Sequence, residues 1–322
     1  MRRVAVRVAQ RVAWLAASLL VASLLIFWVA NALPGDIAQI VLGTNAAPGE
    51  VEALREQWGL NRPFFVRYLE WLAGVVTGDF GTSMITRQAV APLIADKIGL
   101  SFWLIGFGMT LALLIALPVG TYAAVRRNRL DGVIVSAVSQ VGLAVPAFWA
   151  GIMLVLLFAV RLRWLPAGGY EPLSAVGVGA WARSLVLPVL SLALVQASVM
   201  SRYVRSAVID VIHEDYFRTA RSLGWSYLGA LWRHGLRNIA ISLLTVIGLQ
   251  LATLLVGAII IEQVFALPGL GRQLLIAVSQ RDLVVVQGIV LVLVWAVLVI
   301  NFLVDLAYQL VDPRLRRVKE AS

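Results

Sequence analysis

The chain has 322 residues, of which 61% are hydrophobic and 14% charged, and its formal net charge is +10. A soluble domain is nearer half apolar and a quarter charged, so this composition indicates a polytopic membrane protein. The absence of cysteine excludes a disulfide framework and thiol chemistry, and two histidines without cysteine do not make a usual zinc site.

Six charge-free stretches are each long enough to cross a bilayer as a helix, which needs about 20 residues. They cover residues 12–35, 98–125, 132–160, 184–201, 238–261 and 283–304. They are continuously apolar, which excludes the alternating strands of a membrane β-barrel. The first stretch is longer than the core of a signal peptide, so we expect a retained helix.

Residues 36–97 predict an outer segment with a helix of its own. In residues 62–76, Pro63 takes the first helical position. Five apolar residues then fall on one helix face: Phe64, Tyr68, Trp71, Leu72 and Val75. The aromatic residues favour a helix lying at the membrane interface. A packed helix in a small outer subdomain explains the pattern equally well.

Prolines and polar residues are few inside the apolar stretches, and their positions bear on which classes of membrane protein fit. Pro118, Pro146 and Pro188 each predict a kink, which serves either a flexing helix or ordinary helix packing. Asp305 is the only acid expected well inside a helix. Ion-coupled carriers place ionisable groups near mid-membrane, so this pattern disfavours a secondary transporter.

The basic residues predict the orientation. With a cytoplasmic N-terminus, the connections on that side hold 17 of the 27 Lys and Arg residues, and those on the other side hold 10. The excess places both termini in the cytoplasm. Residues 202–237 then form a cytoplasmic loop.

This loop contains the segment "HEDYFRTARSLGW" (213–225), whose charges are costly in hydrocarbon, at about 2.5 kcal/mol each. One apolar stripe at helical spacing comprises Ile212, Tyr216, Ala220 and Leu223, and Gly224 then ends the helix. A second stripe comprises Leu228, Leu231, Trp232 and Leu236. The pattern predicts two short amphipathic helices. The residues alone leave open whether they dock on a protein or lie on lipid headgroups.

Enzyme motifs are missing. There is no Gly-Lys dipeptide, hence no GxxxxGK[ST] phosphate loop, and neither HExxH nor GxSxG occurs. We therefore expect no catalytic residue, metal site or cofactor in this chain.

The segment "DYFRTARSLG" (215–224), followed by "RHGLRNIAI" (233–241), resembles the EAA loop of ABC-importer permeases. It is most similar to the peptide/nickel branch, the DppB/OppB-like family. Ala220 and Gly224 match the pattern, and the EAA letters fall on Arg218, Thr219 and Ala220. Ser242 departs from it, because the family commonly has proline there.

The resemblance continues along nearly the whole chain. Matching blocks lie at 33–36, 59–81, 163–170, 245–250, 264–272, 281–288 and 301–316. It implies an all-α polytopic membrane protein with six transmembrane helices, both termini cytoplasmic, and the ABC importer type I permease fold. Residues 1–97 would form the first transmembrane helix plus a periplasmic helical segment. Residues 98–322 would form a five-helix permease core with a cytoplasmic coupling loop at 203–237.

The implied function is that of the permease subunit of an ATP-driven importer in the bacterial inner membrane. It would move peptides or a related small solute by alternating access, driven by ATPase subunits docked on the EAA-type loop. The implied partners are a second homologous permease, two ABC ATPase subunits that bind ATP and Mg, a periplasmic or lipid-anchored solute-binding protein and membrane lipids, with no nucleic acid. An ion-coupled secondary transporter and a membrane scaffold or receptor remain alternatives. For the substrate, the alternatives are nickel, glutathione or an opine.

The resemblance also assigns site residues. The ATPase-coupling positions are Asp215, Tyr216, Arg218, Thr219, Ala220, Arg221 and Gly224. Ala220 would be small to permit close packing, and Gly224 would take a left-handed backbone. Two outer loops, 161–173 and 267–275, would face the binding protein through Trp164, Pro166, Gly168, Pro268, Gly269 and Gly271.

Overall fold

The structure is a computed structural model that describes residues 2–32, 37–42 and 47–311. Nearly all of these residues are helical, and the pairing of Thr82 with Ala89 is an isolated bridge. The chain divides into two compact units, which are described separately. Unit 1 comprises the residues up to Gly99 together with Gly269–Val299, and unit 2 comprises Leu100–Pro268 together with the residues from Ile300 onward.

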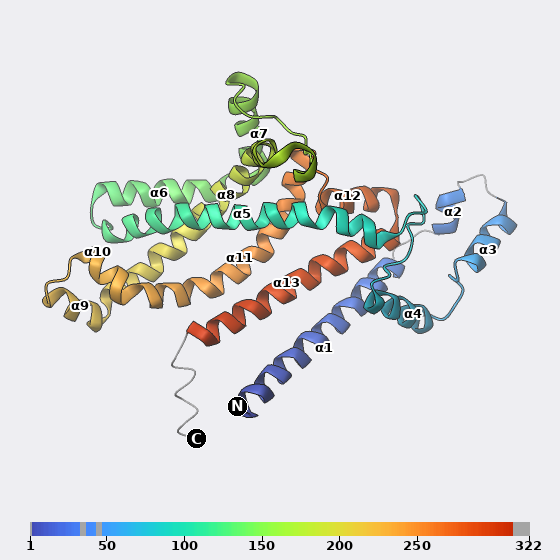
Figure 1. Cartoon of the computed structure of the whole chain (residues 1–322), viewed down its shortest axis with the longest axis horizontal. Helices are drawn as coiled ribbons and strands as arrows, with labels where there is room; N and C mark the ends of the chain where they lie inside the picture. Colours follow the sequence, from blue (N-terminus) through green and yellow to red (C-terminus); the bar gives the residue numbers. More distant parts are fainter. Residues whose placement is uncertain (1, 33–36, 43–46, 312–322) are drawn as a thin grey trace. The chain divides into compact units, whose positions relative to one another are not determined.

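Unit 1 holds six helices or helix parts besides the start of α5. They are α1 (Arg2–Ala32), α2 (Ile37–Leu42), α3 (Pro48–Gln57), α4 (Phe64–Thr77), α12 (Leu270–Gln280) and the first part of α13 (Leu283–Val311) (Figure 1). The division between the units falls inside α5 (Val90–Val125) and inside α13.

Unit 2 is built around α8 (Leu173–His213), which packs against α6 (Leu130–Ala144), α7 (Ala147–Leu154) and α11 (Leu236–Val264). The π-helical segment η1 (Val155–Arg161) extends α7. Three short segments join α8 to α11: α9 (Asp215–Ser222), α10 (Tyr227–Ala230) and the π-helical η2 (Leu231–Gly235). Figure 1 shows α9 and α10 at the same end of the unit as the turn between α5 and α6.

Within the described residues, five helices are long and apolar enough to cross a membrane, and a bent helix pair makes a possible sixth span. The pair is Leu130–Ala144 with Ala147–Arg161, bent by 99°. Its break lies at Pro146, where Val145 has an extended backbone, because a proline disfavours helical geometry in the preceding residue. The kink expected at Pro146 within 132–160 is therefore a full break of the helix. Pro118 lies inside α5, and Pro188 lies inside the part of α8 that follows a break at Gly177, where φ is 76°.

An aromatic cluster in unit 1 holds α4 against α1. The ring of Phe27 lies 5.3, 5.7 and 5.5 Å from the rings of Phe64, Tyr68 and Trp71. Ser23 Oγ lies 2.9 Å from the Tyr68 hydroxyl. The helix face expected from the sequence is thus the face that packs, while Phe65 and Leu69 on the other face are exposed. Pro63 stands one position earlier than expected, as the N-cap residue.

A second contact region of unit 1 joins residues far apart in the sequence. The Ser83 hydroxyl donates to the Asp282 carboxylate, and Met84 N–H donates to the same group at 3.4 Å. A buried apolar cluster surrounds this clamp: Val90, Ile94, Leu270, Ala277, Val285 and Ile289. These contacts place residues 269–299 with the N-terminal helices. The sequence-based division into 1–97 and 98–322 follows chain order and stays a prediction.

Candidate functional site

The end of helix α9 is defined by a glycine. Gly224 has a φ of 88°, in the left-handed region that a side chain resists. Gly224 N–H donates to the Arg221 carbonyl at 3.1 Å, and Trp225 N–H donates to the Ala220 carbonyl at 3.3 Å. This pair of bonds is a Schellman motif, which satisfies the carbonyls at the end of the helix. The glycine stop predicted from the sequence is confirmed, and so is its backbone conformation.

The inner face of α9 is anchored to unit 2. Phe217 and Ala220 are only 2% and 4% exposed, and both belong to the apolar cluster formed with α8, α10 and α11. The Phe217 ring lies 5.3 Å from the Tyr227 ring in an edge-on contact. The Asn238 amide donates to the Tyr216 hydroxyl at 2.8 Å. The small side chain of Ala220 therefore permits close packing of α9 against other helices of the same chain.

Two details of the predicted stripes are wrong. Leu223 is 76% exposed, whereas Phe217, which was outside the predicted stripe, is buried. In the second stripe only Leu231 is buried, while Leu228, Trp232 and Leu236 are exposed, and the π-helical segment η2 changes the helical period from Leu231 onward. A constant spacing of three or four residues fails here for two reasons. Helix α9 ends after two turns, and the π-helical segment η2 has a different number of residues per turn.

The outer face of this region carries charge and apolar surface together. We call it the α9–α10 surface, and it comprises Asp215, Arg218, Thr219, Arg221, Leu223, Trp225, Leu228 and Trp232, all exposed. Arg218 and Asp215 lie 3.7 Å apart as an exposed pair, which contributes little to stability. Arg221 donates to the Trp225 carbonyl and lies 5.6 Å from the centre of the Tyr227 ring. That contact holds α9 against the start of α10.

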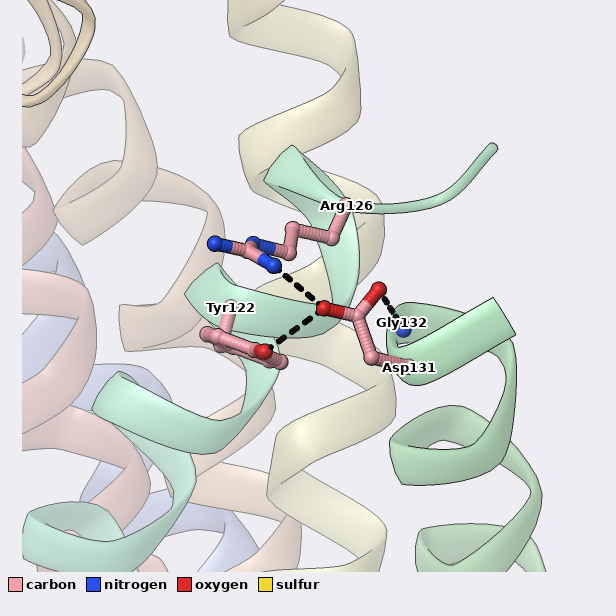
Figure 2. Close-up of polar contacts among 4 residues, drawn as sticks. All are labelled: Tyr122, Arg126, Asp131 and Gly132. Carbon is pink, nitrogen blue, oxygen red and sulfur yellow. Dashed lines mark hydrogen bonds and ion pairs between the residues drawn. The ribbon is translucent and has the colours of Figure 1, made fainter. Parts of the chain in front are cut away.

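The turn between α5 and α6 is held by a charged cluster that the sequence reasoning missed. Figure 2 shows Arg126 and Tyr122 donating to one oxygen of Asp131, while Gly132 N–H donates to the other at 2.9 Å. A side chain at Gly132 would meet the Arg126 carbonyl at 2.1 Å. The signal lay in the run "RRNRLDG" (126–132), whose charges were used only for orientation.

This turn also touches the base of α9. The guanidinium of Arg127 lies 3.2 Å from Nε2 of His213, the last residue of α8. The hydrogen bond with Asp131 raises the pKa of Arg126, and the two side chains form an ion pair. The end of unit 2 that carries α9 is therefore internally braced.

The outer-loop residues separate into two groups. Trp164, Pro166, Gly168 and Pro268 are exposed, and Gly169 N–H donates to the Phe265 carbonyl at 3.4 Å. A side chain at Gly168 would meet that carbonyl at 2.8 Å, so glycine is needed for the close approach. Gly269 and Gly271 belong to unit 1 and are buried, Gly269 as the N-cap of α12. They shape the loop and do not present a surface.

A groove of about 580 Å³ lies in unit 2 between α7, α8 and α11. Its walls are mostly apolar, and Gln196 and Thr253 supply polar groups. The Gln196 amide donates to the Gln250 carbonyl oxygen at 3.0 Å.

One buried acid was missed. Glu262, near the end of α11, is 1% exposed and accepts a hydrogen bond from Ser101 at 2.5 Å. It follows directly after the charge-free stretch 238–261 and lies in the last turn of α11, so Asp305 is joined by a second acid within an apolar helix. Among the described residues, no group of three or more His, Asp or Glu is placed to hold a metal ion.

Comparisons with known proteins cover nearly all of the chain. Residues 116–317 match the family described as binding-protein-dependent transport system inner membrane component, and residues 4–104 match the N-terminal component of the same systems. A putative peptide transport system permease protein of Brucella abortus is 40% identical over 309 residues, which are 95% of this chain and 98% of that protein. The glutathione transport system permease protein GsiC of Salmonella typhi is 38% identical over 309 residues, which are 96% and 98%.

Solved structures show the same fold. The MetNI methionine ABC transporter in an inward-facing conformation matches with a TM-score of 0.56 and 18% identity, over 68% of this chain and 96% of that chain. An amino acid ABC transporter solved with histidines matches with a TM-score of 0.50 and 17% identity, over 68% and 94%.

Proposed function

Because the chain belongs to the family of binding-protein-dependent transport system inner membrane components and is an ABC-importer permease subunit, we propose that it moves peptides inward and is driven through its α9–α10 surface. Glutathione, the solute named for one of the relatives, is itself a modified tripeptide, so the two relatives favour one substrate class. The observation that carries the proposed coupling role is the exposed apolar and basic surface on a rigidly anchored helix.

The composition of the α9–α10 surface supports a protein partner. Leu223, Trp225, Leu228 and Trp232 are exposed beside Arg218 and Arg221. Tryptophan and arginine are the residues most enriched where protein interfaces have their strongest contacts. We assign this surface to an ABC ATPase subunit, which would bind ATP and Mg. Two such subunits would serve the importer.

The anchoring of α9 suits a helix that transmits force. Its inner face is fixed to α8 and α11 through Phe217, Ala220 and the Tyr216–Asn238 hydrogen bond. The same two helices line the groove that contains Gln196. A displacement imposed on α9 would therefore move the groove walls as a rigid body. We propose that this groove is one side of the peptide pathway and that a second permease subunit completes it.

The remaining partners follow from the same proposal. A solute-binding protein would deliver the peptide to the outer loop through the exposed Trp164, Pro166, Gly168 and Pro268. The importer would lie in the bacterial inner membrane, with α9 in the cytoplasm. An ion-coupled secondary transporter is not favoured, because the family to which the chain belongs depends on a binding protein.

The test uses the absence of native cysteine. Single cysteines at Thr219 and Leu228 should form crosslinks with the co-expressed ATPase subunit, and the crosslinked importer should lose peptide uptake. Two matched controls are Ala220→Cys, which is buried in the chain, and Val138→Cys, which is exposed on α6. Equal crosslinking at Val138, or none at either α9–α10 position, would contradict the proposed docking surface.

A further inference from the structure

A cavity of about 500 Å³ lies within unit 1. None of its lining residues belongs to the α9–α10 surface, which is part of unit 2. Helices α1 and α4, the connection between α3 and α4, the turn 80–87 and the first turn of α13 form its walls. This volume is in the range of pockets that hold small organic ligands. The proposed transport mechanism assigns no role to it.

Two of the three arginines that line the cavity have no carboxylate partner among the described residues. Arg62 is paired with Glu70 at 2.9 Å. Arg67 instead donates to the Asn31 side-chain oxygen at 2.5 Å and to the Leu60 carbonyl at 3.3 Å. The guanidinium of Arg87 lies 5.6 Å from the Trp58 ring. Burial lowers the pKa of Arg67, which shows that its charge is partly removed from water.

Two neutral side chains of the cavity wall lack hydrogen-bond partners in the described part of the chain. Trp71 Nε1 is buried without an acceptor. The Gln287 side chain lines the cavity, is only 6% exposed and makes no hydrogen bond within the described ranges. Buried polar groups are nearly always paired, and of these two the Gln287 amide can take a ligand in the cavity as its partner.

The backbone at the cavity edge is also unusual. Arg87 has a φ of 59°, which is uncommon for any residue other than glycine. Such backbone outliers gather at ligand clamps and active sites. Here the conformation accompanies the stacking of the Arg87 guanidinium on the Trp58 ring.

We propose that this cavity binds a small organic monocarboxylate with an apolar or aromatic body. The planar guanidiniums of Arg67 and Arg87 match the two oxygens of a carboxylate, and the Gln287 amide supplies a further donor. The rings of Phe27, Trp58 and Phe80 supply apolar wall for the body of the ligand. Three arginines and two glutamates line the cavity, so its formal charge is +1, which suits a single carboxylate better than a phosphate dianion.

The test measures binding of N-acetyl-L-phenylalanine to the full-length chain in nanodiscs of phosphatidylcholine by isothermal titration calorimetry. We expect one site per chain. N-acetyl-L-phenylalaninamide, which has the same body without the charge, should bind at least tenfold more weakly. If the amide binds as well as the acid, or if inorganic phosphate or an anionic lipid displaces the acid equally well, the proposed selectivity is wrong.

Two variants test the residues. Arg87→Gln should weaken binding of the acid roughly tenfold or more, because a charge-assisted hydrogen bond is lost. Its matched control is Arg163→Gln, since Arg163 also has a positive φ, of 56°, but does not line the cavity. Equal losses in the two variants would overturn the assignment of Arg87.

Calorimetry on the permease alone needs neither the ATPase nor the solute-binding protein. The outcome is therefore independent of the proposed coupling role, and a failure of one proposal leaves the other standing.

Discussion

Helices α4 and α9 are two short amphipathic helices with the same construction and different surroundings. Each ends at a glycine with a left-handed backbone, Gly78 with a φ of 85° and Gly224 with a φ of 88°. Each buries one face in its own unit. Helix α4 itself carries large apolar side chains on its exposed face, whereas the exposed face of α9 is polar and the exposed apolar residues Leu223, Trp225 and Leu228 follow it. The difference lies in what accompanies those side chains.

On α4 the exposed apolar residues Phe65, Val66, Leu69 and Val76 form most of the outer face. On the α9–α10 surface, Asp215, Arg218 and Arg221 stand among the exposed apolar residues. Lipid hydrocarbon accepts the first kind of face, and a protein interface accepts the second. Exposed apolar side chains alone therefore do not distinguish a lipid-facing surface from a protein-binding one. The charged residues beside them make the distinction. We therefore expect α4 to contact lipid and α9 to contact protein.

The largest expected effect is that of Phe217→Ala. Removing a buried aromatic ring from the base of α9 should destabilise this region by about 3–5 kcal/mol. A protease added to inside-out vesicles should then cleave between residues 213 and 225. Phe65→Ala on α4, where the ring is exposed, is the matched control and should leave cleavage unchanged. Protection of α9 in Phe217→Ala would mean that the helix is held by other contacts.

Trp232→Ala should weaken docking of the ATPase subunit by roughly 30-fold, since a tryptophan at the centre of an interface contributes about 2 kcal/mol. Thermal unfolding of the isolated permease should change little, because this side chain is 67% exposed. Leu69→Ala on α4 tests the other half of the comparison and should leave the ATPase affinity as it is. If the two substitutions lowered the ATPase affinity equally, the proposal that only the α9–α10 surface binds the ATPase would be wrong.

The two glycines give a matched pair for backbone strain. A side chain added at Gly224 or at Gly78 would meet nothing within 4 Å, so each substitution tests the left-handed backbone alone. Gly224→Val should cost about 1–2 kcal/mol locally and reduce peptide uptake while the chain stays in the membrane. Gly78→Val should have the same local cost with uptake largely kept. Full uptake and peptide-stimulated ATPase activity in Gly224→Val would contradict the coupling role of α9.

The smallest effect is expected for Tyr216→Phe, which removes the hydroxyl that accepts from Asn238. The loss should be about 1 kcal/mol, the usual net contribution of one hydrogen bond. A modest fall in the unfolding temperature of the permease would show it. Asn238→Ala should give a similar fall, and the double variant should add little to either. Additive losses would mean that the two side chains act separately.

The sequence was a good guide wherever a local pattern determines the structure. Continuous apolar stretches predicted the spans, and the spacing around Gly224 predicted a helix, a stop and a second helix. The packed face of α4 was also predicted, because its aromatic residues repeat at helical spacing. In each case neighbouring residues in the chain determine the result.

The sequence was a poor guide where the outcome depends on distant residues. A proline indicates a kink, but the 99° break at Pro146 depends on what the following helix packs against. The inward position of Phe217 depends on α10 and α11. Burial of Glu262 depends on Ser101, which lies 161 residues away. The lining of the unit 1 cavity comes from five separate segments, so no single stretch indicated it.

The clamp between Ser83 and Asp282 has a consequence for the order in which the protein is made. Its partners lie 199 residues apart, so the ribosome has synthesised almost the whole chain before unit 1 closes. Until residues 269–299 emerge, Val90 and Ile94 lack the apolar neighbours of their cluster. The segment 100–268 of unit 2 is continuous and can assemble first. The helices made first are thus the last to be completed, and they depend on a finished chain for their stability.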